Sequence, residues 1–162
     1  MGARAEALAK RIEQGAAQLA AYVEKLSDAE WNTPVAQARD GRPVGVIVHH
    51  VASVYPIEVQ LAQAIGSGKS MSDVTWDVVK KMNSDHAAAN AGTSRSDALN
   101  LLRKNSSEAA NAVRAFTDEQ LDTAAPFGLS FDAPVTAQFV IEDHALRHSW
   151  HHLARIKETL GK

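Results

Sequence analysis

Apolar residues recur in steps of three and four along most of the chain, which is the period of an amphipathic α-helix. The first stripe consists of Ala5, Leu8, Ile12, Gly15, Leu19, Tyr22 and Leu26. Similar patterns predict helices over residues 5–26, 43–65, 73–91, 96–116 and 134–160. The sequence therefore predicts an all-α protein.

Capping residues and prolines set the expected boundaries of these helices. Ser27 and Glu30 have the spacing of a capping box, which predicts a short helical turn after the first helix. Pro43 and Pro134 suit the first turn of a helix, where the missing amide hydrogen costs nothing. Pro56 lies inside the second helix and is predicted to kink or split it.

Two segments between the helices need separate interpretation. Residues 122–134 are rich in phenylalanine, glycine and proline, which predicts a loop that could cover a site on the helices. Within it, residues 127–131 form the only stretch that could be extended. Residues 66–70 (Gly-Ser-Gly-Lys-Ser) resemble the end of a phosphate-binding loop, but they follow a helix and Gln63 replaces the required glycine. We interpret them as a helix terminator.

Composition narrows the functional classes. With 162 residues, the chain is predicted to form one domain over residues 1–162. The formal net charge of −2 argues against a nucleic-acid partner, and no apolar run approaches the roughly 18 residues needed to span a membrane. The absence of cysteine excludes disulfides, thiolate metal sites and cysteine nucleophiles. We expect a soluble, cytoplasmic protein.

Four of the seven histidines lie within residues 144–152. On a helical wheel, His148 and His152 line one margin of the apolar face of the last helix. They are four residues apart, so two imidazoles on one helix face could bind one ion. His144 and His151 are predicted to turn further toward solvent, although a rotated wheel would bring His144 to the site.

The second helix contributes one more inward histidine. His50 falls on its apolar face, whereas the neighbouring His49 points away. A buried histidine needs partners for its ring nitrogens, and a lone one is usually bonded to a carbonyl. Three inward histidines on two helices favour a metal site, since bundle cores often hold metals between facing helices. A pH-sensitive histidine surface remains an alternative.

Two further residues are candidates for the same site. Glu58 lies two turns after His50 on the inward side, where it could orient a metal ligand or act as a base. Pairing with a lysine or arginine is the alternative. His86 shares a helix face with Val79 and Met82, so it could line a pocket or remain a surface or capping residue.

Two segments resemble the DinB/YfiT-like superfamily. His148-Ser-Trp-His-His152-Leu-Ala-Arg-Ile156 resembles the His-x-x-x-His motif of its final helix, and Gly45-Val-Ile-Val-His-His50-Val-Ala52 resembles its helix-two segment. Trp31 after a Ser-Asp turn also fits, and the resemblance spans nearly the whole chain.

The resemblance implies a four-helix bundle of up-down-down-up topology, with an additional helix between the second and third bundle helices. It also implies a homodimer and a divalent metal on His50, His148 and His152. Zinc and nickel both suit nitrogen ligands. Relatives in this superfamily include transferases that join a low-molecular-weight thiol to a small-molecule electrophile. The sequence therefore predicts a thiol S-transferase, with a non-catalytic metal-binding or stress-response module and a pH-responsive interaction protein as alternatives.

Overall fold

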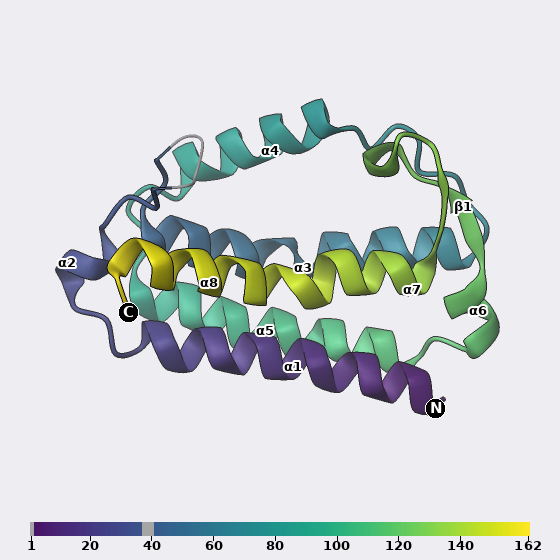
Figure 1. Ribbon diagram of the computed structural model, residues 1–162, viewed down its shortest axis with the longest axis horizontal. Coiled ribbons are helices and arrows are strands. Elements are labelled where there is room, and N and C mark those ends of the chain that lie inside the picture. The colour runs from purple at the N-terminus through teal and green to yellow at the C-terminus, as the bar shows by residue number, and fades with distance from the viewer. Residues whose placement is uncertain (1, 37–40) are drawn as a thin grey trace.

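The computed structural model describes residues 2–36 and 41–162, and four long helical segments lie side by side in it (Figure 1). They are α1 (Ala3–Val23), α3 (Val44–Gly66), α5 (Arg95–Arg114) and a final helix formed by α7 (Ala137–Val140), the π-helical segment η2 (Ile141–Leu146) and α8 (Arg147–Leu160). The first and last run one way, and α3 and α5 run the other way. The predicted up-down-down-up four-helix bundle is confirmed.

The additional helix predicted between the second and third bundle helices is α4 (Trp76–Ala89). It runs back along the bundle, so that α5 starts at the same end as α3 (Figure 1). Helix α4 contributes no buried residue, and Trp76 and Val78 are 47% and 53% exposed. Because it buries little apolar surface, α4 is held less firmly than the other long helices.

Helix α3 is the central core helix. Its apolar residues pack against α5 and the final helix, and 15 of its 23 residues are buried. It is also the one helix in the described chain that is long and apolar enough to cross a membrane, yet 67% of the relevant window is buried inside the protein. Such burial is typical of a bundle core helix. The helix continues through Pro56, so the predicted split does not occur.

The helical stripe predicted for the first helix forms one face of the core. Ala5, Leu8, Ile12 and Leu19 are all buried in α1, against α5 and the final helix. Gly15 permits a close approach, since a Cβ atom there would lie 2.9 Å from the indole nitrogen of Trp150.

Short capped helices connect the long ones. In α2 (Asp28–Trp31), the Ser27 hydroxyl accepts a hydrogen bond from the Glu30 amide, and the Glu30 carboxylate accepts one from the Ser27 amide, as predicted. Helix α6 (Asp118–Asp122) has an equivalent capping box. Both caps satisfy amide groups that a helix end leaves without partners.

The predicted loop after α6 contains a small sheet instead. Strands β1 (Ala124–Pro126) and β2 (Pro134–Thr136) pair antiparallel, and the 3₁₀ turn η1 (Gly128–Ser130) lies between them. The prediction that Pro134 opens the final helix is wrong, because that helix starts at Ala137, where the Thr136 hydroxyl accepts a hydrogen bond from the Phe139 amide. The extended segments flank residues 127–131 rather than occupy them.

Candidate metal centre

Three histidines from two helices converge inside the bundle. His50 comes from α3, and His148 and His152 come from successive turns of α8. Each offers a ring nitrogen, and the three nitrogens lie within 4.8 Å of one another. The ring centroids of His50 and His148 are 5.0 Å apart, those of His50 and His152 are 5.7 Å apart, and those of His148 and His152 are 4.8 Å apart. The imidazoles that the sequence predicted to face inward therefore meet at one point.

Burial keeps two of these imidazoles neutral at pH 7. Desolvation, helped by the neighbouring His148, lowers the pKa of His50 to about 2 and that of His152 well below 6.5. His50 is only 4% exposed, and the His152 ring is enclosed by the rings of His50, His148 and His151. A neutral imidazole is the form that binds a metal.

The buried nitrogens also lack other partners. Within residues 2–36 and 41–162, Nδ1 of His50 and Nδ1 of His152 are buried and make no hydrogen bond. Leaving a buried polar atom without a partner costs about 1–3 kcal/mol. A divalent ion held by nitrogen ligands would satisfy such a site, so the residues present fit the metal that the resemblance implies.

Glu58 fixes the third imidazole. Its side chain is 7% exposed, and the Nδ1–H group of His148 donates a hydrogen bond of 2.6 Å to Glu58 Oε1. This bond orients the ring and leaves Nε2 of His148 to face the other histidines, the arrangement that carboxylates give to metal-binding histidines. The structure therefore pairs Glu58 with His148, and not with a lysine or arginine.

A second pair of histidines borders the first three. His49 Nδ1 and His86 Nε2 lie 2.8 Å apart, so one ring donates a hydrogen bond to the other. The His86 ring is 5.5 Å from the His50 ring, and burial lowers the pKa of both His49 and His86. The sequence interpretation that His49 points away fails because α4 covers that side of α3 and brings His86 to it.

The final helix departs from a regular wheel just before the centre. Residues 141–146 form the π-helical segment η2, which advances each residue by less than 100° and shifts the helix face that follows. As a result, the side chain of His144 is only 17% exposed, and its ring meets the Phe127 ring edge-on at 5.6 Å. The expectation that His144 turns toward solvent is therefore wrong. His151 remains half-buried and accepts a hydrogen bond from Arg155.

One residue near the centre has no role in the sequence interpretation. The positive charge of Arg42 contributes to the lowered pKa values of His50, His86 and His152, after the larger effect of desolvation. Its guanidinium therefore lies within electrostatic range of these histidines. Its only signal in the sequence is its position directly before the proline that opens α3.

The comparisons with known proteins agree with this architecture. Among solved structures, the chain is similar to YfiT from Bacillus subtilis, which is described as a probable metal-dependent hydrolase with an unusual four-helix bundle topology. The two chains superimpose with a TM-score of 0.73 and are 20% identical over 98% of this chain and 87% of that one, which is a likeness of fold. No curated protein matches the sequence. The profile of the DinB superfamily matches residues 11–156, which include all three converging histidines, and the chain belongs to that superfamily.

Proposed function

We propose that the protein is a metal-dependent enzyme in which His50, His148 and His152 hold one divalent ion, zinc or nickel. The observation that carries this proposal is the convergence of three imidazoles, two of them kept neutral by burial and the third oriented by Glu58. A buried cluster of this kind is costly to a fold without a ligand to satisfy it.

The donor set favours a catalytic site over a structural one. An ion held by three imidazoles keeps at least one coordination position open, where it would stabilise a thiolate or lower the pKa of a water molecule. Glu58 holds the His148 ring in place, and His86 of α4 contacts His50 while it is hydrogen-bonded to His49. The positive charge of Arg42 favours an anionic reactant such as a thiolate.

We propose thiol S-transfer as the reaction, with a low-molecular-weight thiol as nucleophile and a small electrophile as acceptor. The resemblance of the histidine motifs and the charge near the centre support it. Hydrolysis is the second candidate, because the similar Bacillus subtilis protein is described as a probable metal-dependent hydrolase.

One assay separates these reactions. Zinc- or nickel-loaded protein is incubated with glutathione, mycothiol or bacillithiol and an electrophile such as monobromobimane, and the conjugate is quantified beside the uncatalysed rate. We expect conjugation with at least one thiol in the wild type and none above background in His152→Ala. Ester hydrolysis without thiol would favour the hydrolase. Bound metal with neither activity would indicate a non-catalytic module, and association that changes between about pH 5 and 8 without bound metal would indicate the pH-responsive alternative.

The Glu58→Gln variant tests the orienting hydrogen bond. We expect its metal affinity to fall by about 10–100-fold, because a neutral amide holds the His148 ring less firmly and makes it a less basic ligand. Competition with a chelator of known affinity measures the change. Glu142→Gln, on the final helix that also carries His148 but outside the three-histidine centre, is the control and should bind metal like the wild type. Equal metal affinities of the two variants would mean that Glu58 does not support metal binding.

The expected assembly and location remain predictions. A homodimer would appear in light scattering at twice the mass of 17.4 kDa. A cytoplasmic location can be checked by fractionating the source cells.

A further inference from the structure

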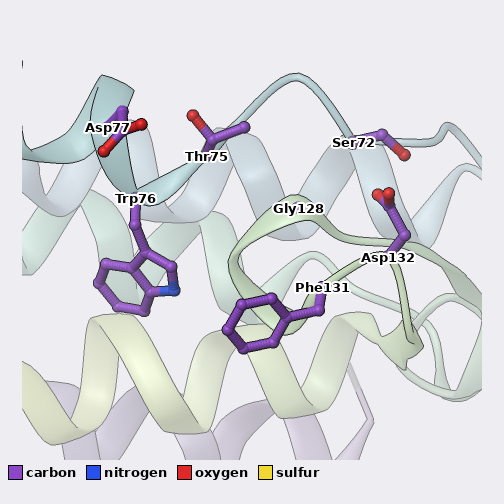
Figure 2. A pocket seen from close by; sticks show the side chains of 7 residues that line it. All are labelled: Ser72, Thr75, Trp76, Asp77, Gly128, Phe131 and Asp132. Carbon is purple, nitrogen blue, oxygen red and sulfur yellow. The ribbon is translucent and has the colours of Figure 1, made fainter.

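A cavity of about 400 Å³ lies at the opposite end of α4 from His86, between the start of that helix and the connection from β1 to β2 (Figure 2). Its volume is in the range of small-molecule sites. It is lined by Ser72, Thr75, Trp76, Asp77, Gly128, Phe131 and Asp132. Trp76 and His86 are ten residues apart, or about 15 Å along the helix, so the cavity is separate from the three-histidine centre.

Hydrogen bonds join the two chain segments that line the cavity. The Gly128 amide donates a hydrogen bond of 3.1 Å to the Met71 carbonyl, and the Trp76 indole donates one of 3.1 Å to the Leu129 carbonyl. A Cβ atom at Gly128 would lie 2.4 Å from the Val74 carbonyl oxygen, so the two connections approach as closely as glycine allows. These contacts join the start of α4 to the connection between β1 and β2.

Phe131 lies in a tight turn between η1 and β2, which the hydrogen bond of 3.1 Å from the Ala133 amide to the Ser130 carbonyl closes. Its backbone lies in the left-handed region (φ 56°, ψ 42°), which is unfavourable for a bulky residue, and Asp132 follows it at φ 63°. The Phe131 side chain is 88% exposed, so packing does not offset this strain. Its ring and the Trp76 ring both extend on the side of the final helix (Figure 2). The turn requires this backbone but favours glycine, asparagine or aspartate in it, so the exposed phenylalanine adds a ring to the cavity without adding to the core.

The charges around the cavity are acidic. No lysine, arginine or histidine lines it, whereas Asp77 and Asp132 do. Asp77 lies in the first turn of α4 and forms an exposed ion pair with Lys80 at 3.2 Å. Among the residues that the structure describes, Asp132 has no ion-pair partner. Exposed aromatic faces beside an unpaired carboxylate attract a positively charged ligand and disfavour an anionic one.

We propose that this cavity binds an organic cation, with its ammonium group against the rings of Trp76 and Phe131 and with Asp132, which lines the same cavity, adding negative charge to it. The site is independent of the proposed metal-dependent reaction. It would hold a small amine-bearing effector.

Choline and its neutral carbon isostere, 3,3-dimethyl-1-butanol, provide a matched pair of probes. Saturation-transfer NMR on the methyl signals of each compound measures binding to the full chain. We expect choline to bind the wild type roughly tenfold more tightly than the isostere, since only choline gains the cation–π attraction. Equal binding of the two compounds, or no saturable choline signal, would overturn the proposal.

Three variants test the residues. Phe131→Gly removes the ring and suits the left-handed backbone, so we expect choline binding to weaken roughly tenfold while thermal stability stays equal or rises. Asp132→Asn keeps a residue that tolerates this backbone and should weaken choline, but not the isostere. Val78→Ala, an exposed position on α4 outside the cavity, should bind choline like the wild type. Unchanged choline binding in Phe131→Gly would overturn the assignment.

Discussion

Addition of Zn²⁺ or Ni²⁺ to metal-free protein is expected to raise its free energy of unfolding by about 4 kcal/mol when the free ion is at roughly 1,000 times its dissociation constant. The reason is that the folded chain brings three imidazoles together, whereas the unfolded chain keeps them apart. Among the described residues, Nδ1 of His50 and Nδ1 of His152 make no hydrogen bond, so no protein partner at these atoms competes with an ion for the rings. Urea unfolding with and without the ion measures the difference.

Two variants show whether this gain comes from the proposed centre. His152→Ala removes one ligand and should lose most of the stabilisation by metal. His151→Ala removes the adjacent histidine, whose ring accepts a hydrogen bond from Arg155, and should keep it. If both variants were stabilised as much as the wild type, the ion would be binding elsewhere on the chain.

Replacement of Gly45 by alanine is expected to lower the free energy of unfolding by about 2–3 kcal/mol. Gly45 lies in the first turn of α3, and a Cβ atom there would be 2.5 Å from the indole of Trp31. Trp31 is only 6% exposed and donates a hydrogen bond to the Thr93 carbonyl, so its rigid ring cannot move aside without loss of packing. Urea denaturation of both proteins measures the change.

Gly92→Ala is the matched control for this substitution. A Cβ atom at Gly92 would have no neighbour within 4 Å, and its backbone is not in the left-handed region. Its free energy of unfolding should therefore stay within about 0.5 kcal/mol of the wild type. Equal destabilisation by the two substitutions would mean that contact with Trp31 is not the cause.

Much of the fold could be predicted from the periodicity of the sequence. The stripe on α1, the capping box at Ser27 and the inward position of His50 all follow from local rules that the packed structure keeps. His148 and His152 share a helix face because both lie in α8, where the helix is regular. The convergence of these three imidazoles depends on four-residue spacing and on two apolar faces that must meet in the core.

The errors arise where tertiary contacts override local preference. A wheel of 100° per residue misplaced His144, because the π-helical segment η2 shifts the helix face. No residue type in the sequence predicts this segment. The partner of His49 was missed because the position of α4 over α3 depends on packing rather than on sequence spacing. Pro134 suits a helix start as well as Pro43 does, but it lies in β2, which pairs with β1.

The metal content of purified protein tests the account most directly. Wild type and five variants are loaded with zinc or nickel, freed of excess ion and analysed for bound metal by elemental analysis. We predict one ion per chain in the wild type, in His49→Ala and in His151→Ala, and loss of that ion in His50→Ala, His148→Ala and His152→Ala. Metal retained by all three ligand variants, or absent from the loaded wild type, would contradict the three-histidine centre.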